Sequence, residues 1–271
     1  FLYWLARMLS LAKVAVSFIL FSLVAMSSLS ASQTSNWQSK QAADKFTQTA
    51  STALEPVYGY MADYLASRFD LAGATGTGID LGGGPGNLCV ELAQRSPSMR
   101  WIDADINPNF FPHLDQLADS TGVGSRVKGV RADAVDLPFS DQSAGFVISR
   151  GSFQFWSDLD KAVSEIHRVL EPGGTAFIGR GLPPNMPADI ARQVRRAQNG
   201  GPSYDIDATE RHLLDAVKKL GIKDYKIIRP TPQGADKINY GLWLEFSRDK
   251  LEGGLISEGQ RAYAMDTLLF R

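Results

Sequence analysis

The sequence predicts an α/β fold built on a doubly wound, mostly parallel sheet of seven strands. Short strand-like apolar runs alternate with amphipathic helical stretches from residue 73 to residue 248, and this alternation is typical of parallel sheets with helices on both faces. A glycine-rich segment, 82–86, follows the first strand-like run and leads directly into a helical stretch. Such turns at the carboxyl end of a parallel strand commonly form ligand sites.

Each element follows from a local pattern. Residues 41–69 show apolar residues at helical spacing with Pro56 as a break, so two helices are expected there. In the last helix of the domain, over 207–220, Asp207 is expected to be the N-cap and Gly221 to end the helix. The other helices are expected over 87–95, 109–119 and 158–170. Strands are expected over 78–81, 100–104, 126–131, 145–149, 175–179, 225–228 and 242–246.

The N-terminal segment has the length and composition of a membrane anchor. Residues 1–29 are almost wholly apolar, and the run from Val14 to Leu29 contains no charge, which is about long enough to cross a hydrocarbon core of ~30 Å. We therefore expect residues 1–30 to form an uncleaved, signal-like transmembrane helix in the lipid bilayer, with other membrane-protein subunits packing against it. A cleavable signal peptide is the alternative, because basic residues precede the apolar run and small residues end it.

The remaining chain divides into three parts. Residues 31–72 are expected to form a linker and N-terminal helices, 73–248 the α/β domain and 249–271 a C-terminal tail. Basic residues flank the apolar run almost evenly, so the positive-inside rule does not choose the membrane face. A cytoplasmic domain would suit an enzyme that uses a cytoplasmic cofactor, and an extracytoplasmic one would suit a structural subunit.

Composition excludes several classes of function. The formal net charge is −1, which gives no basic field for a nucleic acid. A single cysteine, Cys89, rules out an internal disulfide and a cysteine-based metal site. The three histidines have no metal-ligand spacing, so no metal is expected. His113, His167 and His212 are each expected on helices as surface or packing residues, so no catalytic base is assigned.

Four segments narrow the ligand of the glycine-rich turn. The turn itself reads DLGGGPG at 80–86, and alone it would suit NAD, FAD or S-adenosylmethionine (SAM). It is followed by WIDADINP at 101–108, DAVDLPF at 133–139 and EIHRVLEPGG at 165–174. In order and spacing these segments resemble the motifs of class I SAM-dependent methyltransferases, and most generally the branch that methylates quinone precursors and other small molecules.

The resemblance implies a Rossmann-like class I methyltransferase fold with SAM as cofactor. It places Asp105 at the tip of the second strand, where an acid accepts both ribose hydroxyls, with Asp103 as a weaker candidate one pleat back. It places Asp133 near the adenine amino group, and Asp80 beside the glycine loop and the methionyl ammonium. The turn 172–174 is expected to be structural. The implied cofactor-binding residues are Asp80, Gly82, Gly84, Gly86, Asp105, Ile106, Asp133, Ala134 and Arg150.

Two segments depart from the pattern of the family. Ala144 and Gly145 stand where relatives carry Phe-Asp, and the lost carboxylate is expected to loosen the site. The stretch 150–156 is bulky and aromatic where relatives have small or histidine residues, which would suit a large flat or apolar substrate, a plugged site or packing against a partner. Tyr204 and Asp205 are expected to line a substrate pocket, and Glu165 and Arg168 to form a surface ion pair.

Two functions follow, from different classes. The first is a membrane-anchored SAM-dependent methyltransferase that acts on a small lipophilic acceptor. The second is a non-catalytic structural subunit of a multisubunit membrane complex that has recruited a methyltransferase fold, because a fold does not guarantee its ancestral activity. An NAD-dependent oxidoreductase fits the segments 133–139 and 165–174 less well than a methyltransferase does.

Overall fold

The computed structural model describes residues 37–198, 204–232, 234 and 238–250. The expected anchor at 1–30 and almost all of the expected tail lie outside the described residues. Within these described ranges, no helix has the length and apolar character needed to cross a membrane.

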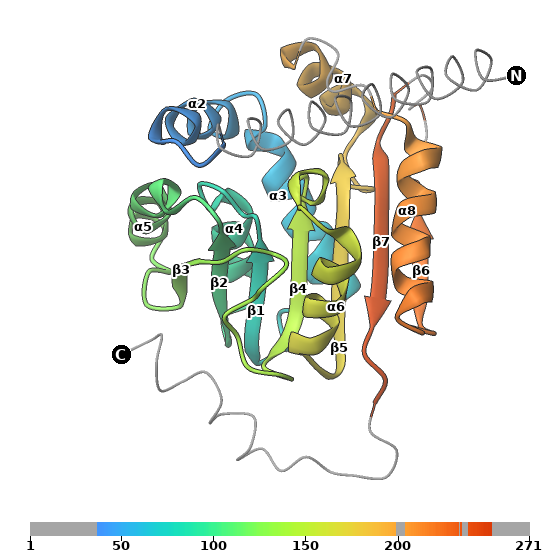
Figure 1. The fold of residues 1–271 in the computed structure, drawn as a ribbon. Helices are drawn as coiled ribbons and strands as arrows, with labels where there is room; N and C mark the ends of the chain where they lie inside the picture. Colours follow the sequence, from blue (N-terminus) through green and yellow to red (C-terminus); the bar gives the residue numbers. More distant parts are fainter. Residues whose placement is uncertain (1–36, 199–203, 233, 235–237, 251–271) are drawn as a thin grey trace, which may run out of the picture.

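Seven strands form one twisted sheet in the order β3-β2-β1-β4-β5-β7-β6 (Figure 1). Neighbouring strands pair in parallel except at β7, which runs antiparallel to both β5 and β6. This confirms the predicted seven-stranded, mostly parallel sheet. The strands are β1 (Gly76–Leu81), β2 (Met99–Asp105), β3 (Val127–Arg131), β4 (Ala144–Arg150), β5 (Leu170–Gly181), β6 (Tyr225–Ile228) and β7 (Gly241–Ser247).

Helices cover both faces of the sheet, as a doubly wound fold requires. Buried residues of α3, α4 and α7 share one apolar cluster with Trp101, Phe177 and Trp243 of the sheet. Buried residues of α6 and α8 form a second cluster on the other face. The helices are α2 (Lys40–Ala50), α3 (Glu55–Arg68), α4 (Asn87–Arg95), α5 (Phe111–Ser120), α6 (Leu159–Val169), α7 (Ala188–Ala197) and α8 (Ile206–Lys219), with short 3₁₀ turns η1 (Pro108–Phe110) and η2 (Phe153–Phe155).

Three details differ from the sequence prediction. The N-cap of α8 is Asp205, whose carboxylate accepts from Ala208 N, and not Asp207, which pairs with Arg229 instead. Helix α7 was not predicted, because the insert after β5 begins with three prolines within five residues, 183–187, which obscure the helical pattern behind them. The Pro-Gly-Gly turn lies inside β5, at a register irregularity opposite the start of β4.

Candidate functional site

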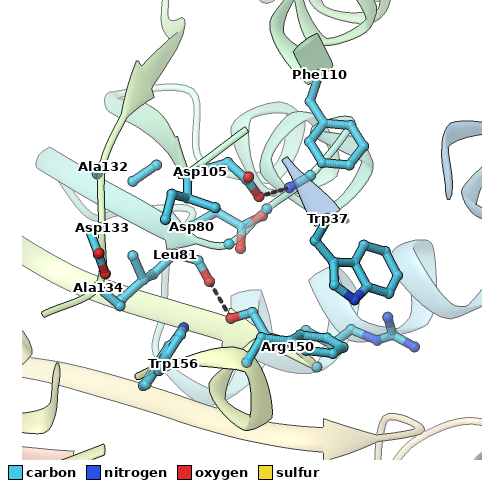
Figure 2. Close-up of a pocket in the computed structure, with 18 of the residues that line it drawn as sticks. Trp37, Asp80, Leu81, Asp105, Phe110, Ala132, Asp133, Ala134, Arg150 and Trp156 are labelled. Carbon is cyan, nitrogen blue, oxygen red and sulfur yellow. Dashed lines mark hydrogen bonds between the residues drawn. The ribbon is translucent and has the colours of Figure 1, made fainter. Parts of the chain in front are cut away.

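An open pocket lies at the carboxyl ends of β1, β2 and β4, where the connections on either side of β1 diverge (Figure 2). The pocket and the solvent-filled mouth continuous with it hold about 980 Å³ of empty space. Its lining combines the glycine loop, the tips of three strands and an aromatic wall. Every cofactor-binding position predicted from the sequence lines this pocket except Gly86.

The glycine loop needs its glycines for both conformation and space. Gly82 and Gly84 have φ values of 71° and 62°, a region that other residues rarely adopt. A Cβ on Gly82 would collide with Ser152, whose hydroxyl donates to the Leu81 carbonyl at 3.0 Å. A Cβ on Gly84 would come within 3.2 Å of the Phe46 ring. The loop therefore presents bare backbone to the pocket, a cradle that side chains would fill.

Asp105 holds the glycine loop and faces the pocket at the same time. Its Oδ2 accepts from Gly84 N at 3.0 Å, and its Oδ1 accepts from Asn107 N at 2.8 Å (Figure 2 shows the first bond). Burial raises the pKa of this carboxyl, and the two backbone hydrogen bonds oppose that rise. Each carboxylate oxygen can accept more than one hydrogen bond, so Asp105 has capacity for the hydroxyls of a ribose.

The adenine side of the predicted site is formed by the β3–β4 connection and the end of β2. Asp133 lies exposed on that connection, and its Oδ1 accepts from Val135 N at 3.2 Å. Its carboxylate therefore also caps the loop, as in an Asx turn, while no described residue donates a hydrogen bond to its second oxygen. Ala132, Ala134 and Ile106 supply the apolar surface that a purine ring needs on its faces.

Asp80 and Arg150 form the opposite, ionic end of the pocket. Burial raises the pKa of Asp80 to about 7, and the charge of Asp105 adds to this effect while Arg150 opposes it. Asp80 Oδ2 and Arg150 Nε are buried without hydrogen-bond partners among the described residues. The Arg150 guanidinium lies over the Tyr58 ring at 5.3 Å. The Asp80 carboxyl suits the ammonium of an amino-acid moiety, and the Arg150 guanidinium suits its carboxylate. Each of the two side chains has a buried polar atom that such a ligand would satisfy.

Asp103 lies beneath the pocket and does not line it. It pairs with Asp80 across the parallel register of β1 and β2, and a Cβ on Gly83 would come within 2.6 Å of its Oδ2. Both of its oxygens are buried without partners among the described residues. Burial raises the pKa of Asp103 well above its ordinary value, and the charges of Asp80 and Asp105 raise it further. The prediction that Asp103 contacts the cofactor is therefore wrong, because the glycine loop covers it.

An aromatic wall, made of Trp37, Phe46, Phe110 and Phe155, closes one side of the pocket. The Trp37 ring lies 5.0 Å from the Phe155 ring and 6.1 Å from the Phe46 ring, which is 6.1 Å from Phe110. Trp37 and Phe155 are 39% and 46% exposed, so both edge the mouth of the pocket. The wall leaves the pocket open, so segment 150–156 does not plug it.

The chain before α2 is fastened to the loop after β2. Asn107 Nδ2 donates to the carbonyls of Trp37 and Ser39 at 2.7 and 3.2 Å, and Asn109 Nδ2 donates to the Gln38 carbonyl at 3.3 Å. Sequence reasoning missed Trp37, Phe46, Tyr58 and Phe110 as pocket residues. In the sequence, the hint that another segment docks there was the pair of amide side chains, Asn107 and Asn109, in the loop beside Asp105.

Several sequence predictions have a different structural role. Gly86, with φ 83°, is the N-cap of α4, where a Cβ would collide with Leu114 of α5. Tyr204 and Asp205 do not line the pocket: the Tyr204 hydroxyl donates to the Arg180 carbonyl at 3.0 Å, and Asp205 caps α8. Ala144 and Gly145 begin β4, a seven-residue strand whose other end lines the pocket. The carboxylate missing at Gly145 would thus lie about 17 Å from Arg150 along the strand, at the end away from the pocket.

The Glu165–Arg168 ion pair is confirmed at 2.7 Å, and it joins two of the sequence motifs. Glu165 accepts from Leu137 N, while Arg168 donates to the carbonyls of Leu137 and Phe139. The pair therefore fixes the 133–139 segment, and with it Asp133, against α6. None of the three histidines lines the pocket, so none of them is placed to act as a catalytic base there.

The central part of this chain is similar in sequence to known proteins. A family model described as a methyltransferase domain matches residues 79–178. A demethylmenaquinone methyltransferase from Thermus thermophilus is 33% identical over 106 residues, covering 39% of this chain and 47% of that protein. The chain therefore spans about half the length of this relative. A 2-phytyl-1,4-naphtoquinone methyltransferase from a Nostoc species is 26% identical over 211 residues, 72% of this chain and 87% of that protein.

A solved structure extends the likeness to nearly the whole described domain. A Methanococcus maripaludis protein assigned as an S-adenosyl-L-methionine-dependent methyltransferase is 26% identical, with a TM-score of 0.67. The match covers 80% of this chain and 96% of that chain. The resemblance seen in the sequence motifs is thus confirmed for the fold and the methyltransferase domain, while the contacts of individual site residues with the cofactor stay predictions.

Proposed function

Since the chain carries a class I SAM-dependent methyltransferase domain, we propose that it transfers the methyl group of SAM to a small, lipophilic, quinone-like acceptor. The observation that carries this proposal is the pocket itself, in which a bare glycine loop, a ribose-binding acid and an unsatisfied Asp80–Arg150 pair lie around one cavity. The aromatic wall supports a flat or apolar acceptor. The quinone methyltransferases among the relatives support the same class.

Two ends of the pocket would bind different parts of the cofactor. We assign Asp105 to the ribose hydroxyls, and Asp133, Ala134 and Ile106 to the adenine. Arg150 then pairs with the methionyl carboxylate and Asp80 accepts from the ammonium, which favours the ionised form of Asp80 and so lowers its pKa. The part of the pocket lined by the segment after β4 and by the aromatic wall is left for the acceptor.

SAM, when bound, supplies a methyl group on a sulfonium that is already activated. The protein then has to align an acceptor atom with that methyl group for in-line displacement. Asp105, Asp80 and Arg150 would hold SAM, which would give up its methyl group to the acceptor and leave as S-adenosylhomocysteine. The aromatic wall and the glycine loop contribute by orienting the two reactants and excluding water. The non-catalytic alternative has less support, because an open pocket with unsatisfied polar atoms costs stability and suits a ligand.

Replacing Arg150 by glutamine is expected to weaken SAM binding about tenfold, because a charge-assisted hydrogen bond to the carboxylate is lost. Isothermal titration calorimetry on the full chain in detergent would measure this with SAM and with 5′-methylthioadenosine, which lacks the amino-acid moiety. The affinity for 5′-methylthioadenosine should change by less than about twofold. A folded wild-type chain that binds neither SAM nor S-adenosylhomocysteine would contradict the proposed function.

We also propose that residues 1–30 hold the domain at a membrane and that other membrane-protein subunits pack on that segment. The proposal rests on the uncharged run from Val14 to Leu29 and on the lipophilic acceptor. After expression of the full chain, alkaline carbonate washing of the membranes should leave the protein in the pellet. Release of the uncleaved chain into the supernatant would show that the segment does not span the bilayer.

A further inference from the structure

Three arginines gather at the carboxyl ends of β4 and β5 and under α7. Arg150 ends β4 and lines the pocket, and Arg180 is the next-to-last residue of the neighbouring strand β5. Arg195 belongs to the last turn of α7, which lies above that end of the sheet in Figure 1. Among the described residues, no Asp or Glu forms an ion pair with any of the three.

The three guanidinium groups are positioned by aromatic rings and backbone carbonyls. Arg180 lies over the Tyr204 ring at 4.7 Å, as Arg150 lies over Tyr58. Arg195 donates to the Asn239 carbonyl at 2.6 Å and to Gln198 Oε1 at 3.2 Å. Arg150 also feels the charge of Asp80, whereas no described carboxylate compensates Arg180 or Arg195, since rings and carbonyls carry no full negative charge.

The arrangement is electrostatically unfavourable without a ligand. Burial lowers the pKa of Arg195, and the nearby positive charges of Arg150 and Arg180 lower it further. Burial also lowers the pKa of Arg180, against the effect of Tyr204. Like charges held together and partly withdrawn from water destabilise a fold, and such arrangements are characteristic of binding sites for the opposite charge.

We propose that Arg180 and Arg195 bind an anionic group, a carboxylate or a phosphate, on the methyl acceptor. This inference rests on the proposed function, in which Arg150 is occupied by the methionyl carboxylate and the acceptor lies at the carboxyl end of β4. The aromatic wall then receives the apolar part of the acceptor and the two arginines its charged end. The acceptor is thus an amphiphilic acid, because a neutral quinone ring alone would leave the charges of the two arginines unpaired.

Matched aromatic probes test this directly. 2-Naphthoate, 2-naphthyl phosphate and the neutral 2-naphthylmethanol share one ring system and differ in the charged group. Calorimetry on the full chain, with and without saturating S-adenosylhomocysteine, should show at least one anion binding about tenfold more tightly than the alcohol. Which of the two anions binds more tightly identifies the group as a carboxylate or a phosphate. Equal binding of all three probes would overturn the proposal.

Variants locate the anion site. Arg180→Gln and Arg195→Gln should each reduce the affinity for the preferred anion about tenfold, leave the alcohol unchanged and leave S-adenosylhomocysteine binding intact. Arg195→Lys keeps the charge and should retain most of the affinity, which separates a charge effect from misfolding. The control is Arg192→Gln, an exposed arginine of the same helix that donates to the Gly234 carbonyl. Anion binding that survives both glutamine variants would refute this assignment. A wild-type chain that does not bind S-adenosylhomocysteine would instead refute the proposed function.

Discussion

Replacing Asp105 by alanine is expected to weaken binding of both SAM and 5′-methylthioadenosine by about 100-fold or more. In the proposed site the wild-type carboxylate accepts from two ribose hydroxyls, and charge-assisted hydrogen bonds of this kind contribute about 1.5–3 kcal/mol each. The same substitution removes the bonds to Gly84 N and Asn107 N, which shape the glycine loop. Calorimetry with the two ligands, on the full chain, measures the loss.

The pattern across ligands and variants is what makes this test specific. Asp105→Ala should affect both ligands, since both carry the ribose, whereas Arg150→Gln should affect SAM alone. Asp115→Ala is the matched control, because Asp115 lies exposed on α5 and does not line the pocket. A loss of less than about threefold in a variant that melts like the wild type would show that Asp105 does not hold the ribose.

Residues whose role depends on local pattern were predictable from the sequence. The strand pattern over 100–104 places Asp105 at the tip of β2, and a glycine-rich turn between a strand and a helix requires the positive φ values found at Gly82 and Gly84. The order of the motifs gave the sheet and its helices. These features are short-range, so neighbouring residues determine them.

Residues that meet only through tertiary packing were not predictable. Trp37 and Phe155 are separated by more than a hundred positions, yet their rings lie 5.0 Å apart at the mouth of the pocket. Asp103 and Asp105 share one face of β2, and the sequence could not show that the glycine loop would bury the first and expose the second to the pocket. The arginine group depends on α7, an unpredicted helix that brings Arg195 over the end of β5.

Replacing Asp103 by asparagine is expected to stabilise the fold by about 2 kcal/mol or more at pH 8, and by much less at pH 4. Asp103 is buried beside Asp80 with no hydrogen-bond partner among the described residues, and both carboxyls have raised pKa values. Above about pH 4 the unfolded state has released the protons of these carboxyls, whereas the folded state, with its raised pKa values, still holds them. The wild type therefore loses stability as the pH rises from about 4 toward neutrality.

Asparagine copies the size of the protonated acid and cannot ionise, so the variant should lose the part of this pH dependence that Asp103 contributes. Asp80, whose pKa of about 7 comes from its own burial and from the charge of Asp105, should keep its own share of the slope. Urea unfolding at pH 4, 6 and 8 measures the free energy of unfolding of each variant. Asp115→Asn, an exposed change on α5, should leave the wild-type slope intact. If the stability difference between Asp103→Asn and the wild type is constant over this range, Asp103 is not the buried acid that holds the proton.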